Sequence, residues 1–213
     1  MAFAGWPEEA LDFYDGLEAD NSKAYWTRHR ETYETKVLGP MTELLDELAA
    51  DFGPAKIFRP YRDTRFSKDK SPYKTAIAAR LQDGYVQLSA RGLAVGNGMY
   101  SMAPDQLERY RRAVASAAAG PGLERLIAAV RGHGIEVRGH ETLKKAPRGY
   151  VADHERIELL RCKGLIAWQE WPAEAWLGTP AARQRVADFL TATQPLADWL
   201  STHVGDSTAE PTR

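Results

Sequence analysis

The feature that most constrains the fold is a change of hydrophobic period at Gly53-Pro54. Apolar residues recur at helical spacing over residues 7–52, whereas the next stretch, KIFRPYRDTRF at 56–66, alternates with the period of a strand. Helices followed by strands do not make the regular strand-helix alternation of a doubly wound fold. The sequence therefore predicts an α+β protein.

The helical region is predicted to form three amphipathic helices in series, with breaks at Asp20-Asn21 and at Gly39-Pro40. In the strand over 56–66, Pro60 cannot donate a hydrogen bond to a sheet, so this strand is expected at an edge or at a bulge. Turn residues separate three further strand candidates, which predict an antiparallel meander over 75–82, 85–90 and 93–100.

After the meander the period returns to that of helices over residues 107–130. Two short strand candidates follow at 134–139 and 165–168, and a last helix is expected at about 179–203, with a kink at Pro195. The prediction is a single domain over 1–204, a central antiparallel sheet flanked by N-terminal and C-terminal helices. The polar tail 205–213 is expected to be disordered.

Composition and motifs exclude several classes of protein. Hydrophobic residues make up 44% and charged residues 27%, a balance typical of soluble globular proteins, and no apolar run approaches the roughly 18 residues of a membrane span. The N-terminus lacks a signal-peptide pattern, so we expect a cytoplasmic protein.

The single Cys162 cannot form an internal disulfide and is expected to be a buried thiol. The five histidines lack metal-site spacing and no complete nucleotide-binding motif occurs, so neither metal nor cofactor is predicted.

The stretch RDTRFSKDKSPYKT, residues 62–75, is strongly basic in a chain whose formal net charge is −1. A solvated loop is one interpretation. The other is an anion site, because strand alternation would place Arg59 and Arg65 on one face with Asp63, as recognition of carboxylates and phosphates often requires. On that basis we expect Asp63 to lie between arginines and to have a depressed pKa.

A second basic segment, KKAPRGYVADHE at 144–155, contains Arg148 as a further candidate ligand for an anion. Asp153 is interpreted as the N-cap of a helix. His154 has two interpretations, an exposed histidine at that helix start or a base that acts near neutral pH.

Three stretches in order, ADNSKAYWTRHRETYE, IFRPYRDTRFSKDKSPYKT and LKKAPRGYVADHERIELLRCKGL, resemble the signatures of a bacterial and fungal family, domain of unknown function 2461. The resemblance extends over nearly the whole chain. In the first signature Asn21 matches the family's asparagine, while Ala24-Tyr25-Trp26 stands where the family usually has Glu-Trp-Phe. The resemblance implies a single domain of this length and no particular substrate.

The leading functional hypothesis is a pocket in which the two basic segments converge on an anionic, phosphate-bearing small molecule, with or without catalysis. A nucleic-acid-binding module using loop 62–75 is an alternative, against which the calculated isoelectric point of 6.5 argues. A protein-interaction module using the same loop is the third. The oligomeric state does not follow from the sequence. The candidate ligand-binding residues are Arg59, Arg62, Arg65, Lys68, Lys70, Lys74 and Arg148, and the candidates for proton transfer are Asp63, Tyr73 and His154.

Overall fold

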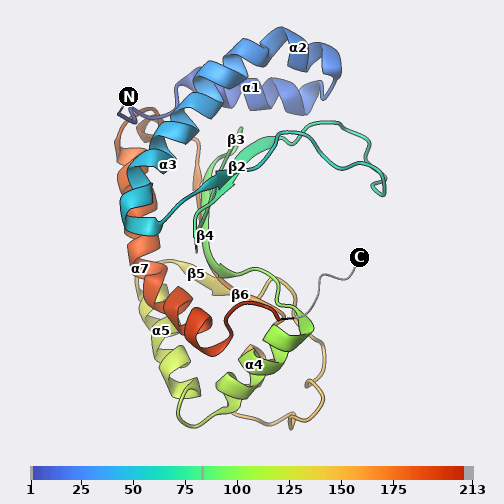
Figure 1. Ribbon diagram of the computed structural model, residues 1–213, viewed down its shortest axis with the longest axis vertical. Coiled ribbons are helices and arrows are strands. Elements are labelled where there is room, and N and C mark those ends of the chain that lie inside the picture. Colours follow the sequence, from blue (N-terminus) through green and yellow to red (C-terminus); the bar gives the residue numbers. More distant parts are fainter. Residues whose placement is uncertain (1, 83, 209–213) are drawn as a thin grey trace. The chain divides into compact units, whose positions relative to one another are not determined.

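The computed structural model describes residues 2–82 and 84–208, and within them the chain is an α+β protein, as predicted. The described strands form a six-stranded antiparallel sheet in the order β1-β2-β3-β4-β6-β5 (Figure 1). The chain divides into two compact units: unit 1 comprises Met1–Val95 and Glu170–Phe189, and unit 2 comprises Gly96–Gln169 and Leu190–Arg213. The chain passes from one unit to the other within β4, β6 and α7, so neither unit is one continuous stretch of sequence.

Unit 1 begins with four helical segments, α1 (Glu8–Ala19), α2 (Lys23–Thr32), η1 (Tyr33–Leu38) and α3 (Gly39–Phe52). Helix α2 starts at Ser22, whose hydroxyl accepts a hydrogen bond from the amide of Tyr25 at 3.1 Å. This side-chain cap satisfies one of the amides that a helix start leaves free. The predicted break at Asp20-Asn21 is therefore confirmed.

The break predicted at Gly39-Pro40 is wrong. Segment η1 is π-helical, and the amide of Gly39 donates to the carbonyl of Glu34. Pro40 then falls at the very start of α3, where an absent N–H costs no intrahelical hydrogen bond. The wider π-helical turn thus lets the chain continue from α2 into α3 without a loop.

The meander is confirmed by four strands that neighbour one another in sequence order: β1 (Lys56–Ile57), β2 (Ala76–Arg80), β3 (Gly84–Ser89) and β4 (Gly92–Met99). In the antiparallel register of β2 and β3, Ala78 lies opposite Gln87. The edge position expected from Pro60 is also confirmed, because β1 is the edge strand. The turn residue Asp83 lies outside the described residues.

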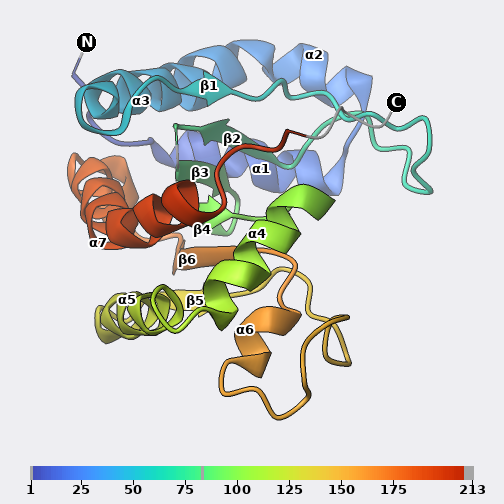
Figure 2. The same cartoon turned by 60° about the horizontal axis from the view of Figure 1, so that its bottom comes forward.

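The strand predicted over 56–66 is much shorter than expected. After Ile57 the ladder continues only as a hydrogen bond from the amide of Phe58 to the carbonyl of Ala78, and as an isolated bridge between Tyr61 and Tyr73. Pro60 has no N–H to donate, so regular pairing cannot run through it. Residues 58–75, here called the arm, therefore leave the sheet, and both views show them extending past the ends of α1 and α2 (Figures 1 and 2).

The core of unit 1 follows the helical period read from the sequence. In α3 the buried residues Met41, Leu44, Leu45 and Leu48 recur at spacings of three and four. They share the interior with fully buried side chains of the segment before α1, of α1 itself and of the sheet, including Trp6, Tyr14, Leu17, Leu88 and Leu93.

Unit 2 contains α4 (Pro104–Ala115), α5 (Gly120–Gly132), β5 (Glu136–Arg138) and α6 (Ile157–Arg161), all visible in Figure 2. Strand β6 (Leu165–Pro172) pairs antiparallel with β5, and Val137 lies opposite Ala167. Both strands were predicted, but β6 extends to Pro172, beyond the predicted end at Trp168. Helix α4 contacts α5 and α6, while α5 contacts β5.

The long C-terminal helix α7 (Ala181–His203) follows a single 3-10 turn, η2 (Ala175–Gly178), and matches the predicted last helix closely, with Pro195 inside it. Beyond it, the described part of the tail expected to be disordered contacts α4. Asp105 accepts hydrogen bonds from the hydroxyl of Ser207 at 2.8 Å and from the amide of Thr208 at 2.9 Å. The remaining tail, 209–213, lies outside the described residues.

Candidate functional site

The arm is a two-stranded hairpin without a regular ladder. The amide of Lys74 donates to the carbonyl of Pro60 at 2.8 Å, and the amide of Arg62 donates to the carbonyl of Pro72 at 2.9 Å. These two bonds flank the Tyr61–Tyr73 bridge. The arm is therefore paired at its base, and its tip is formed by residues 63–71.

The base of the arm is fixed to the start of α2 by Asn21 and Trp26. The amide side chain of Asn21 makes two hydrogen bonds of 3.1 Å with the backbone of Tyr73, one to its carbonyl and one from its amide. The ring of Tyr73 stacks on that of Trp26, with centroids 4.4 Å apart and an interplanar angle of 6°. Two of the three stretches quoted from the sequence therefore meet at Tyr73.

The packed position of Tyr73 affects the acidity of its hydroxyl. Tyr73 is 5% exposed, and burial raises the pKa of its hydroxyl above the ordinary value. The hydroxyl therefore keeps its proton at neutral pH. The contacts of Tyr73 suit packing, and its predicted part in proton transfer stays a prediction.

The carboxylates of the arm are held by arginines of the arm. Asp63 accepts hydrogen bonds from Arg65 Nε at 3.0 Å and Nη2 at 2.7 Å, and Asp69 pairs with Nη1 of Arg62. The hydrogen bonds from Arg65 lower the pKa of Asp63 to about 2, and Arg59 adds a smaller electrostatic contribution. The depressed pKa expected for Asp63 is confirmed. Side-chain exposures of 77% for Arg65 and 45% for Asp63 mean that this pair contributes little to stability.

The other predicted cations of the arm do not form ion pairs with a described carboxylate. Nζ of Lys70 donates to the carbonyl of Thr64 at 2.9 Å, and Nζ of Lys74 lies 5.5 Å from the centroid of the Phe58 ring. Arg59 and Lys68 are exposed. The arm therefore presents positive charge at its surface.

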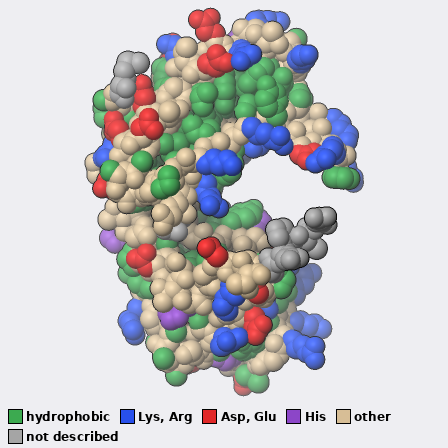
Figure 3. All heavy atoms as spheres, viewed as in Figure 1, with side chains coloured by type: hydrophobic (Ala, Val, Ile, Leu, Met, Phe, Trp, Pro, Cys, Tyr) green, Lys and Arg blue, Asp and Glu red, His purple; other side chains and the backbone are tan. Residues whose placement is uncertain are grey.

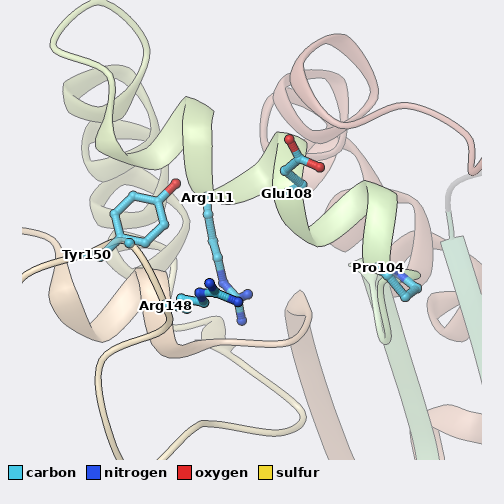
Figure 4. Close-up of a pocket in the computed structure, with 6 residues that line it drawn as sticks. Pro104, Glu108, Arg111, Arg148 and Tyr150 are labelled. Carbon is cyan, nitrogen blue, oxygen red and sulfur yellow. The ribbon is translucent and has the colours of Figure 1, made fainter.

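Unit 2 contains a cavity of about 370 Å³ between α4 and the loop at 146–150. Figure 4 shows its lining residues as sticks. The cavity, here called the two-arginine cavity, is lined by Pro104, Glu108, Arg111, Arg148, Gly149 and Tyr150. Of the ligand-binding residues predicted from the sequence, only Arg148 lines it.

The two arginines reach the cavity from different elements, and their guanidinium ends point toward one another in Figure 4. Nε of Arg111, on α4, donates to the carbonyl of Leu160 at 3.2 Å, which holds its side chain in place. Within the described residues neither Arg111 nor Arg148 pairs with a carboxylate. Glu108, which shares the cavity, is paired instead with Arg112 at 2.9 Å.

Gly149 lets Arg148 and Tyr150 face the same cavity. Its φ of +90° lies in the left-handed region that favours glycine. The amide of Tyr150 closes the turn by donating to the carbonyl of Pro147 at 3.2 Å. The Pro-Arg-Gly-Tyr stretch is thus a tight turn that presents a guanidinium and a phenol together.

The interpretation of Asp153 as a helix cap is wrong. Helix α6 starts only at Ile157, its N-cap is Arg156, and no side chain caps it. Residues near Asp153 form turns instead, in which the amide of Arg156 donates to Nδ1 of His154 at 3.0 Å. That ring nitrogen is therefore an acceptor, so the neutral imidazole carries its proton on Nε2. His154 does not line the two-arginine cavity.

Sequence reasoning missed Arg111. It lies in a cluster of three arginines on α4, where Arg109 pairs with Asp105 and Arg112 pairs with Glu108 at helical spacing. Glu108 lies three positions before Arg111 and four before Arg112, and in the structure it pairs with Arg112. The sequence therefore did not show that Arg111 would lack a carboxylate partner among the described residues. The arm and loop 146–150 belong to different units, so their convergence on one ligand stays a prediction.

Cys162 is buried, as expected, and burial raises the pKa of its thiol.

Residues 2–82 and 84–208 contain no group of three His, Cys, Asp or Glu side chains that could hold a metal ion. Over the same residues no single helix has the length and apolar character to cross a membrane, although α4 and α5, bent by 93°, meet that test as a pair.

The fold and this geometry define an α+β protein in which one cavity contains two arginines that pair with no carboxylate of the described residues. Residues 9–199 match the family described as conserved hypothetical protein (DUF2461), and the chain belongs to this family. A comparison with curated proteins found no match. Among solved structures, a conserved hypothetical protein from Pyrococcus furiosus is 11% identical with a TM-score of 0.37, over 80% of this chain and 99% of that one.

Proposed function

We propose that the two-arginine cavity binds an anionic small molecule that carries a phosphate group. The observation that carries this proposal is that Arg111 and Arg148 line one cavity without a carboxylate partner among the described residues. Two guanidinium groups that line one cavity repel one another, and an anion between them removes that repulsion. The planar fork of each guanidinium matches the oxygens of a phosphate.

The size and lining of the cavity agree with a small ligand. Its volume of about 370 Å³ lies near the lower end of the usual range for small-molecule sites, roughly 300–1,000 Å³. Tyr150 supplies a phenol that can donate to a further oxygen of the ligand. Pro104 and the ring of Tyr150 supply apolar surface for the remainder of the molecule.

The test is a calorimetric titration of the full chain with inorganic phosphate and with pyrophosphate. Arg111→Ala and Arg148→Ala should each weaken binding by about tenfold or more, since a hydrogen bond to a charged group contributes roughly 1.5–3 kcal/mol. Arg125→Ala is the matched control, because Arg125 is an exposed arginine of α5 that does not line the cavity. Equal affinity in all four proteins would refute the proposal.

A further inference from the structure

The arm carries a net positive charge opposite in sign to that of the remainder of the chain. Residues 58–75 contain six cationic side chains and two carboxylates, a formal charge of +4. Because the whole chain has a formal charge of −1, all other residues together carry −5. Lys and Arg atoms gather on the projecting arm in Figure 3. A polyanion would therefore be attracted to the arm.

Aromatic rings are exposed along the same segment. Phe58 is 37% exposed, Tyr61 is 52% exposed and Phe66, at the tip, is 96% exposed. Each is followed or preceded by an arginine: Arg59 follows Phe58, Arg62 follows Tyr61 and Arg65 precedes Phe66. Rings and cations that alternate along one extended segment form the pattern of a surface on which bases stack while phosphates are neutralised.

The base of this surface is rigid. The ring of Tyr61 lies 5.5 Å from that of Tyr73 and 6.1 Å from that of Trp26, so buried rings support it from one side. Asn21 fixes the backbone of Tyr73 through two hydrogen bonds. A ring held in this way loses little conformational freedom when a base stacks on its open side.

We propose that the arm binds single-stranded nucleic acid, with bases stacking on Tyr61 and Phe66 and with phosphates contacting the neighbouring arginines and lysines. A duplex fits these observations less well, because its paired bases hide the faces that exposed rings would contact. An anionic membrane also fits less well, because the rings are spread along the arm and only Phe66 lies at the tip. The proposal does not depend on the two-arginine cavity, which belongs to the other unit.

The test is fluorescence anisotropy of a labelled 20-nucleotide oligothymidylate, titrated with the full-length chain at several salt concentrations. Phe66→Ala should weaken binding by about tenfold, as is typical for loss of one stacked base. Its almost complete exposure means that the fold should not change. Tyr100→Ala is the matched control, because Tyr100 is 58% exposed in unit 2, and it should bind as the unchanged protein does.

The contribution of phosphate contacts to binding is tested with the double variant Lys68→Gln/Lys70→Gln on the arm. The control is the double variant Lys144→Gln/Lys145→Gln, which changes two exposed lysines of unit 2. The arm variant should lower the slope of log affinity against log salt by about 1.4, since each phosphate contact on a single strand contributes about 0.7. The control pair should leave the slope unchanged.

Three results would overturn the proposal: equal or tighter binding of a duplex of the same sequence, equal affinity of Phe66→Ala, or no binding to the oligonucleotide. Phosphatidylserine vesicles serve as a further probe. Vesicle binding that requires Phe66, with no binding to the oligonucleotide, would assign the arm to a membrane surface instead.

Discussion

The arm of unit 1 and the two-arginine cavity of unit 2 are both cationic, but they are built in opposite ways. In the arm the carboxylates Asp63 and Asp69 are paired with arginines two and seven positions away, at an exposed surface. In the cavity Arg111 and Arg148 come from separate elements and have no carboxylate partner among the described residues. The number of cations in a stretch of sequence therefore does not show which of them pair with a carboxylate in the fold.

The two regions also differ in how they are joined to a core. The base of the arm is part of the interior of unit 1 through Trp26, which is 7% exposed. The cavity is bounded by exposed or half-buried side chains. Stability should therefore respond strongly to changes at the base of the arm and weakly to changes in the cavity lining.

The largest effect is expected for Trp26→Ala. This change removes the ring that stacks on Tyr73 and contacts Tyr33, and truncation of a buried tryptophan costs about 3–5 kcal/mol of unfolding free energy. Chemical denaturation followed by circular dichroism measures it. Phe66→Ala, on the same arm, should stay within about 0.5 kcal/mol. Equal effects of the two variants would show that the base of the arm is not packed as described.

A smaller loss is expected for Asn21→Ala. The variant leaves the amide and carbonyl of Tyr73 without their partners, which costs about 1–3 kcal/mol. Hydrogen exchange of the Tyr73 amide should become faster. Asn21→Asp keeps an acceptor for that amide and should retain more of its protection. Unchanged exchange in Asn21→Ala would mean that the arm is held by the aromatic stack alone.

Substitution of either arginine of the cavity should weaken phosphate binding, but the two substitutions should lower the free energy of unfolding by different amounts. Arg111→Ala removes the hydrogen bond to the carbonyl of Leu160 and should cost about 0.5–1.5 kcal/mol. Arg148→Ala should stay within about 0.5 kcal/mol, since Arg148 is exposed and lies on a turn. Thermal melts of the two variants side by side measure the difference. A larger loss for Arg148→Ala would reverse their assigned roles.

The smallest effect concerns the pH dependence of the Asp63–Arg65 pair. The pKa of Asp63 is lowered from 3.8 to about 2, so the pair stabilises the fold above pH 3.8 and loses that contribution as pH falls toward 2. The contribution is small because the pair is exposed. A carboxyl-carbon NMR titration should place the midpoint near 2, and Arg65→Ala should return it toward 3.8. A midpoint that does not move in Arg65→Ala would show that another group lowers it.

Errors in the predicted fold arose where a local rule was overruled by neighbouring structure. Pro40 is a helix breaker by rule, but the π-helical segment before it places it at a helix start. Asp153 is a good N-cap by residue type, but the turns around His154 delay the helix to Ile157. The alternation over 56–66 is that of a strand, but regular pairing ends after Ile57, and beyond Pro60, which has no N–H to donate, only an isolated bridge between Tyr61 and Tyr73 remains.

The sequence by itself determined the features that depend on neighbours along the chain. The change of period at Gly53-Pro54 indicated the α+β class, the turn residues indicated the meander, and the closeness of Arg65 to Asp63 indicated their pairing. Hydrophobic period and turn residues strongly limit the local structure that a segment can adopt. A single sequence is therefore enough to predict helices, strands and contacts between near neighbours.

Only the tertiary structure decided which distant residues meet. Asn21 contacts the backbone of Tyr73, and Arg111 lines a cavity with Arg148, although each pair lies far apart in the sequence. Such contacts depend on which apolar faces are buried together, and many pairings of helices and strands satisfy the same hydrophobic pattern. Packing of α4 against α5 and α6 therefore placed Arg111 in the lining of the same cavity as Arg148.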